Sequence, residues 1–132
     1  MSNLLKKIPA YKEIENFAFK YPRLVDRGRI AEYFVSFLLG VKLSSKINAP
    51  IDGTSKKYGR VEIKNRLISA KTHPGMKVNL NAIDHLIYVE LGSSAPLLRR
   101  IWVIPSKALT KQPAGRVSFK KAFKNSEYTR VF

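Results

Sequence analysis

Residues 59–66 read GRVEIKNR, in which apolar and polar side chains alternate with a period of two. Successive side chains of a β-strand point to opposite faces, so Val61 and Ile63 are expected on one face of such a strand. The other face would carry four charged side chains: Arg60, Glu62, Lys64 and Arg66. The pattern predicts a half-buried strand that places a carboxylate beside an ammonium group.

A shorter strand-like piece, APIDG at residues 49–53, lies just upstream. The polar residues 54–59 connect the two pieces and end in a second glycine, which suits a hairpin loop. Folding this hairpin would bring Asp52 beside Glu62, with Lys64 next to them. Two adjacent carboxylates repel each other unless a cation or a proton lies between them. Because Mg²⁺ is commonly held by carboxylates and water, the spacing predicts a magnesium site.

The charge of the chain indicates the substrate. There are 25 Lys and Arg residues against 9 Asp and Glu, a net charge of +16 over 132 residues. Such a field attracts polyanions, of which nucleic acid is the commonest, although an acidic membrane surface or an acidic protein would answer the same charge. Three of the few acids, Glu32, Asp52 and Glu62, fall in or near one motif, where phosphates would have to approach. A metal-dependent phosphodiesterase needs carboxylates there, whereas a protein that only binds phosphates does not.

Helical periodicity predicts one helix over residues 11–21 and a second that begins at an Asp26 N-cap and closes at Gly40. The main apolar face of the second helix is expected at Ile30, Phe34, Phe37 and Leu38, with Glu32 on the opposite side. Residues 86–91 and 101–104 are apolar enough for central strands.

Shorter elements are expected elsewhere in the chain. They are a strand within residues 41–47, a short helix within 69–83, another over 106–109, and a final basic amphipathic helix around Phe119 and Phe123. Together these elements predict an α/β or α+β fold with a mixed central sheet flanked by helices.

The pattern Pro50-Ile51-Asp52 … Glu62-Ile63-Lys64, preceded by a helix that carries Glu32, resembles the PD-(D/E)xK nuclease superfamily. Archaeal-type Holliday-junction resolvases are the nearest subfamily. The resemblance implies a restriction-endonuclease-like αβββαβ core over about residues 25–110 of a single domain spanning 1–132. Residues 69–83 leave room for only a short helix where the family has a substantial one, and the basic segment 113–132 matches nothing in the family.

The resemblance also implies roles for individual residues. Asp52 and Glu62, with the main-chain carbonyl of Ile63, would hold Mg²⁺, for which Mn²⁺ can substitute. Lys64 would orient or help deprotonate the attacking water, and Glu32 would orient a water or complete a second metal site. The expected partner is DNA, in repair or recombination, and a homodimer would be needed to cut both strands. Phosphate contacts are expected from eight basic residues: Arg60, Arg66, Lys56, Lys57, Lys71, Lys77, Lys120 and Lys121.

Other compositional features narrow the range of functions. The absence of cysteine excludes disulfides, thiolate zinc sites and a cysteine nucleophile. No apolar run approaches the ~20 residues of a membrane span, and no signal peptide is recognisable, so a cytoplasmic protein with no membrane or small-molecule cofactor is expected.

Two alternatives remain open. In a non-catalytic basic nucleic-acid-binding protein, Asp52 would be a turn residue, and Glu62 and Lys64 would form a solvated pair. An enzyme acting on another phosphorylated substrate ranks last, because no Gly-rich phosphate loop is present.

Overall fold

The computed structural model describes residues 3–45, 50–68, 76–111, 116–118 and 129–130. Its helices are α1 (Tyr11–Lys20) and α2 (Arg27–Leu39), with 3-10 turns at Leu5–Lys7 and Ser106–Ala108. Its strands are β1 (Lys42–Leu43), β2 (Gly53–Ser55), β3 (Gly59–Leu67), β4 (Met76–Lys77), β5 (His85–Leu91), β6 (Leu98–Pro105), β7 (Thr110–Lys111), β8 (Arg116–Ser118) and β9 (Thr129–Arg130).

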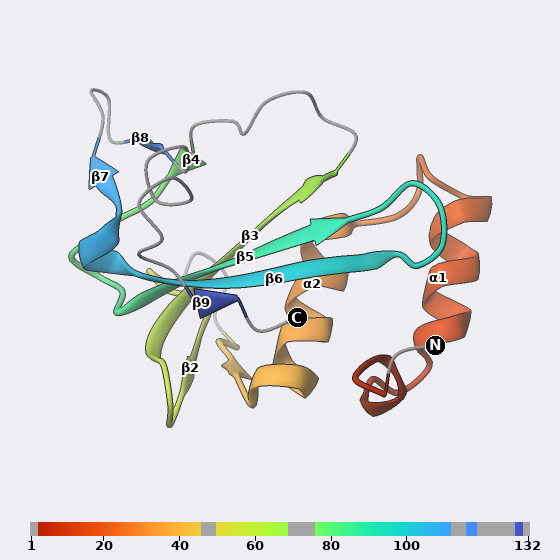
Figure 1. The fold of residues 1–132 in the computed structure, drawn as a ribbon, viewed down its shortest axis with the longest axis horizontal. Coiled ribbons are helices and arrows are strands. Elements are labelled where there is room, and N and C mark those ends of the chain that lie inside the picture. Colours follow the sequence, from red (N-terminus) through yellow and green to blue (C-terminus); the bar gives the residue numbers. More distant parts are fainter. Residues whose placement is uncertain (1–2, 46–49, 69–75, 112–115, 119–128, 131–132) are drawn as a thin grey trace.

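The main sheet has six strands in the order β1-β2-β3-β5-β6-β9 (Figure 1). The β3–β5 pair is parallel and every other pair in it is antiparallel, so the sheet is mixed, as expected. Three short strands form a second sheet in the order β4-β8-β7. The chain is therefore an α+β protein with a mixed central sheet.

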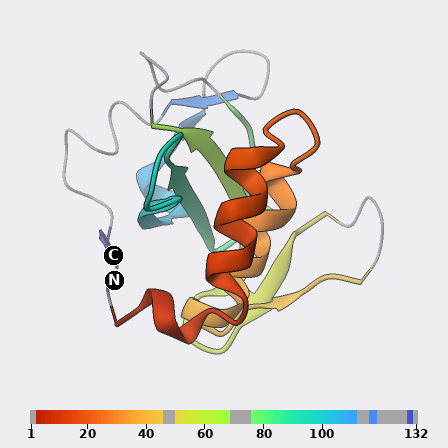
Figure 2. The ribbon, with the colours of Figure 1, turned by 90° about the vertical axis from the view of Figure 1, so that its right-hand side faces the viewer.

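Both long helices cover the same face of the main sheet (Figures 1 and 2). Along β5, Ile87 and Val89 pack in the core beneath these helices. Leu86 and Tyr88 point the other way, into a smaller apolar cluster that includes Trp102. Because β5 is buried on both faces, it reads as a nearly continuous apolar run, which is why the sequence identified it as a central strand.

The ends of α2 lie where the sequence predicted them. Asp26 caps the helix, since its Oδ1 accepts the main-chain N–H of Arg29 at 3.1 Å. Gly40 closes the helix in the left-handed conformation, with φ of +63°, which glycine adopts without steric cost.

The predicted apolar face of α2 was partly wrong. Ala31, Phe34 and Val35 are the buried residues, whereas Phe37 is 47% exposed. Helical spacing correctly placed Phe34 in the core and Ile30 and Leu38 against it, but it misplaced Phe37 and missed Ala31 and Val35. The buried side is rotated away from Phe37, and Glu32, next to Ala31 on the chain, is half-buried.

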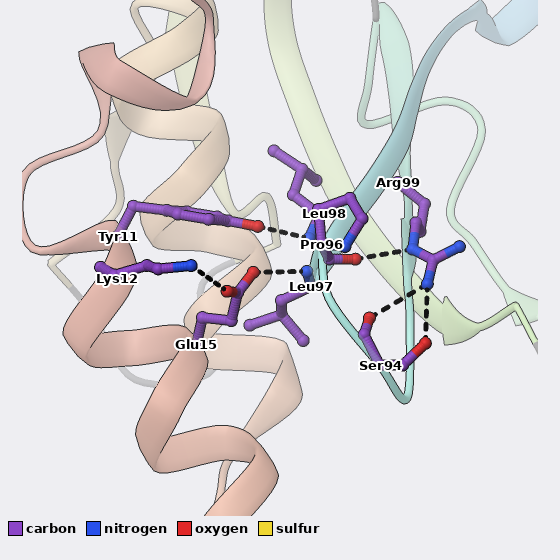
Figure 3. Close-up of polar contacts among 8 residues, drawn as sticks. All are labelled: Tyr11, Lys12, Glu15, Ser94, Pro96, Leu97, Leu98 and Arg99. Carbon is purple, nitrogen blue, oxygen red and sulfur yellow. Dashed lines mark hydrogen bonds and ion pairs between the residues drawn. The ribbon is translucent and has the colours of Figure 1, made fainter. Parts of the chain in front are cut away.

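Two polar side chains fix α1 to the connection between β5 and β6 (Figure 3). Glu15 is only 3% exposed, and its Oε2 accepts the main-chain N–H of Leu97 at 2.8 Å. The Tyr11 hydroxyl accepts the main-chain N–H of Leu98 at 3.0 Å, and Lys12 Nζ lies 3.3 Å from the second Glu15 oxygen. Helix α1 is thereby held to residues more than 80 positions away in the chain.

The shorter predicted elements had mixed outcomes. The strand expected within 41–47 is present as β1, and the helix expected over 106–109 is a single 3-10 turn. Among the described residues between β3 and β5 there is β4 and a turn but no helix; residues 69–75 and the helix expected at Phe119 and Phe123 lie outside the described residues. None of the described helices combines the length and the apolar character needed to cross a membrane.

Candidate functional site

The site is built on the hairpin of β2 and β3. The two strands are antiparallel, with Gly53 opposite Val61 and Ser55 opposite Gly59, and residues 56–58 form the turn. The expected hairpin is therefore confirmed. The register ends at Gly53, and Asp52 lies in the bend just before it, where its main-chain N–H donates to the carbonyl of Val61 at 3.0 Å and its carbonyl accepts from Ser44 on the other side.

Beyond the end of β2, the Asp52 side chain provides the next hydrogen bond to β3. Its Oδ2 accepts the main-chain N–H of Ile63 at 2.7 Å, so a carboxylate occupies the position of a strand partner. The N–H and C=O groups of one residue point to the same side of a strand, as the paired bonds of an antiparallel ladder require. The carbonyl of Ile63 therefore faces the same edge of β3 as the Asp52 carboxylate.

Glu62 and Lys64 lie on the strand face that the alternation predicted. Lys64 Nζ lies 3.2 Å from Glu62 Oε1, and the side chains of Lys64 and Glu62 are 32% and 18% exposed. Burial raises the pKa of Glu62 above its usual value, the Lys64 ammonium opposes that rise, and the Asp52 carboxylate adds to it. The protein thus holds a carboxylate in a position where its ionised form is disfavoured.

Helix α2 contributes Glu32 to the same region. Burial raises the pKa of Glu32, and repulsion from Asp52 raises it further, while the Arg29 guanidinium opposes the rise. Asp52 is thus within electrostatic reach of both Glu32 and Glu62. It interacts with both of the other acids singled out in the sequence: with Glu32 on α2, which covers one face of the sheet, and with Glu62, which points to the other face of β3.

The residues present suit a hard divalent cation that keeps several of its waters, but not a metal site made entirely of protein ligands. Within the described ranges, no group of three or more His, Cys, Asp or Glu side chains is placed to hold a metal ion. The candidate donors are the carboxylates of Asp52 and Glu62 and the carbonyl of Ile63, all oxygen ligands. Mg²⁺ usually binds through one or two carboxylates and keeps several waters, so this smaller set suits it.

The two arginines of β3 both have acidic partners. Arg60 is exposed and pairs with Asp84 through its guanidinium, at 3.2 Å, and through its main-chain N–H, at 2.8 Å. The Arg66 side chain is only 11% exposed and lies 3.2 Å from Oε2 of Glu90. Their expected contacts with phosphate stay predictions, and the ion pairs show that both guanidinium groups also have a structural partner.

The lysines expected to contact phosphate are spread over several elements. Lys56 and Lys57 are exposed in the turn between β2 and β3, with Lys57 Nζ lying 5.3 Å from the centre of the Tyr58 ring. Lys77 is exposed on β4. Three others, Lys71, Lys120 and Lys121, lie outside the described residues.

Sequence reasoning missed Ser44, which holds the main chain around Asp52. Its N–H donates to the Asp52 carbonyl at 2.8 Å, and its hydroxyl donates to the carbonyl of Ile51 at 2.9 Å. These bonds depend on how β1 pairs with β2, and a lone serine in a polar stretch gives no signal of that pairing.

It also missed the buried Glu90, which is 3% exposed and accepts the indole N–H of Trp102 at 2.6 Å. Here a signal was present, because a single carboxylate in an otherwise apolar strand must find partners when it is buried.

No protein-family model matches the chain, and no curated protein matches it.

Proposed function

We propose that the protein is a Mg²⁺-dependent endonuclease that hydrolyses phosphodiester bonds in DNA, with a site of the PD-(D/E)xK type. One observation carries the proposal: the Asp52 carboxylate accepts the main-chain N–H of Ile63 and helps to raise the pKa of Glu62, and Lys64 lies 3.2 Å from Glu62. Carboxylates with raised pKa values are common at catalytic and metal sites. A protein that carries 25 basic residues supplies the field that would bring a polyanion to them.

Asp52, Glu62 and the carbonyl of Ile63 would hold the cation. When bound there, Mg²⁺ would neutralise charge on the scissile phosphate and lower the pKa of a bound water. The Lys64 ammonium would hydrogen-bond the attacking water or a phosphate oxygen and stabilise the negative charge that develops there. Glu32, with its raised pKa, would orient that water through its carboxyl group.

The restriction-endonuclease-like core and a homodimer belong to the same proposal. A parallel pair, β3 and β5, beside an antiparallel hairpin is compatible with that core. A single site cuts one strand, so a two-fold dimer would be required to cut both strands of a duplex or a junction symmetrically.

The alternative is a basic nucleic-acid-binding protein without catalytic activity. The observation that favours it is the lack, in the part of the chain that the structure describes, of three or more metal-binding side chains in one group. In that case the ion pair of Glu62 and Lys64 would be only a surface feature of β3.

Incubation of the purified protein with linear duplex, single-stranded and four-way-junction DNA separates the two. The nuclease is expected to cut at least one form in Mg²⁺ or Mn²⁺ and none in EDTA. A protein that binds these DNAs but leaves all of them and RNA intact with either metal would be the non-catalytic alternative.

A further inference from the structure

The C-terminal half of α1 and the loop after it expose an unusual share of apolar surface. Phe17 is 45% exposed and Tyr21 is 42% exposed, with ring centroids 5.3 Å apart and planes at 47°. Leu24, three residues further on, is 73% exposed. Among the described residues, the only other large apolar side chain this exposed is Phe37. Exposed apolar side chains gathered in one place indicate an interaction surface.

One basic side chain contacts this aromatic pair, and two more follow closely in the chain. Lys20 Nζ lies 5.4 Å from the centroid of the Tyr21 ring, and Arg23 and Arg27 follow in the loop and in the first turn of α2. Within the described ranges, none of these three cations forms an ion pair with a carboxylate. Asp26, between the two arginines, is engaged as the N-cap of α2. The surface is therefore both aromatic and positively charged.

A recess lies between α1, α2 and the C-terminal ends of β3 and β5. Its volume is about 280 Å³, and its mainly apolar lining includes Ala18, Phe19, Pro22, Val25, Ile30 and Leu67. Small-molecule sites usually exceed about 300 Å³, so this recess suits a projecting group of a larger ligand. Val25 and Ile30 also line a second groove, of about 390 Å³, which passes Phe17 and carries Glu13 on its rim.

The surface is held in place relative to the candidate site. The bonds from Glu15 and Tyr11 to the β5–β6 connection fix α1 to the sheet (Figure 3). Strand β3 runs from Glu62 and Lys64 to Leu67, which lines the recess. At about 3.3 Å per residue, Lys64 and Leu67 are about 10 Å apart along the strand, and they point to opposite faces of it. The recess therefore lies on the helix-covered face of the main sheet, and Lys64 lies on the other face.

We propose that Phe17, Lys20, Tyr21 and Arg23, the α1 platform, bind unpaired nucleotides of a DNA strand, so that the protein prefers DNA with a single-stranded tail. Aromatic side chains stack on any base, and neighbouring cations neutralise the phosphates between the bases. A second copy of the chain fits less well, because a two-fold interface centred on this surface would bring Lys20 and Arg23 against their own counterparts. The inference rests on the proposed function only for the choice of nucleic acid as partner.

Fluorescence anisotropy in EDTA tests the proposal without cleavage. The probes are a labelled 20-nucleotide oligo(dT), a blunt hairpin duplex, and the same duplex with a single-stranded tail. The variants are Phe17→Ala/Tyr21→Ala, the ring-free but apolar Phe17→Leu/Tyr21→Leu, and the ring-retaining Tyr21→Phe. Phe37→Ala is the matched control, since it removes an exposed ring from α2.

Both double variants are expected to weaken binding of oligo(dT) and of the tail by about ten-fold or more, and binding of the blunt duplex by less than two-fold. Tyr21→Phe and Phe37→Ala should leave all three affinities within two-fold of wild type. Unchanged affinity for oligo(dT) in either double variant, or equal losses on all three probes, would overturn the proposal. Sedimentation velocity gives another outcome that would overturn it. If the wild type is a dimer and Phe17→Leu/Tyr21→Leu is a monomer, the surface serves self-association.

The two proposals fail separately. If the double variants lose single-strand binding selectively while the wild type cleaves no DNA in Mg²⁺, the α1 platform is supported and the nuclease is rejected. Cleavage without that selectivity would support the nuclease and reject the platform.

Discussion

Asp52 Oδ2 accepts the main-chain N–H of Ile63 at 2.7 Å, so a carboxylate serves as a hydrogen-bond partner of β3 on its β2 side, beyond the last paired residue of β2. The bond fixes one oxygen of Asp52 against the strand that carries Glu62. The same acid therefore stabilises the fold of the hairpin and supplies negative charge to the candidate site. Variants that separate hydrogen bonding from charge can distinguish these two contributions.

Asp52→Ala should lower the free energy of unfolding by about 1–3 kcal/mol, because the half-buried N–H of Ile63 loses its acceptor. Asp52→Asn should cost less, since the amide oxygen can still accept that bond. Urea unfolding followed by circular dichroism measures both. Equal stabilities of the Ala and Asn variants would mean that the hydrogen bond contributes nothing to folding.

Glu62→Gln should stabilise the protein at neutral pH. The raised pKa of Glu62 means that the folded state disfavours the ionised form, so its ionisation costs stability as the pH rises through that raised pKa. The gain in melting temperature should be present at pH 7–8 and should vanish below the ordinary glutamate pKa of about 4.3.

The same variant gives a test of cation binding that does not depend on activity. Adding Mg²⁺ should raise the melting temperature of the wild type, because a ligand that binds only the folded state stabilises it, and should have little effect on Glu62→Gln. A variant less stable than wild type at pH 7, or equal Mg²⁺ responses in the two proteins, would contradict this account of Glu62.

Glu90→Gln should be strongly destabilising, by about 3–5 kcal/mol, because it removes the carboxylate that pairs with the nearly buried Arg66. The glutamine can still accept the indole N–H of Trp102, so the loss reports mainly on charge. Asp84→Asn is the control, because it weakens the exposed ion pair with Arg60 and should shift the urea midpoint far less. Similar shifts for both variants would mean that burial does not set the strength of the Arg66 pair.

The affinity for duplex DNA should fall steeply with salt. If the basic surface neutralises several phosphates, the logarithm of the binding constant should fall with the logarithm of salt concentration by about 0.9 per phosphate contacted. Lys56→Gln/Lys57→Gln, in the exposed hairpin turn, should reduce that slope by about two and leave the fold intact. A flat salt response of the wild type would show that the basic surface is not the DNA-binding surface.

The sequence predicted features whose causes are local. The period-two alternation over residues 59–66 predicted β3 and its polar face, and the glycines around it predicted the hairpin. Asp26 and Gly40 predicted both ends of α2, because capping depends on the backbone of one helical turn. The pairing of Asp52 with the strand of Glu62 followed from the hairpin alone.

Features that depend on distant parts of the chain escaped prediction. The hydrogen bond from Leu97 to Glu15 spans 82 residues, and nothing near Glu15 in the sequence indicates it. Phe37 was misplaced because the spacing of apolar residues does not fix which side of α2 meets the sheet and α1. Ser44 reaches Asp52 only after β1 pairs with β2.

The central claim is that Asp52, Glu62 and Lys64 act as one catalytic unit, and it is tested most directly by measuring DNA cleavage and DNA binding on the same variants. Asp52→Ala, Glu62→Ala and Lys64→Ala should each reduce Mg²⁺-dependent cleavage by orders of magnitude. The three groups act on the same water and phosphate, so the loss of any one of them removes most of the catalysis. Their DNA affinity should stay within a few-fold of wild type, and removal of a carboxylate should tighten binding if it changes at all. Folding of each variant is verified by circular dichroism. Folded variants that cleave at the wild-type rate, or a wild type that cleaves equally well in excess EDTA, would contradict the account.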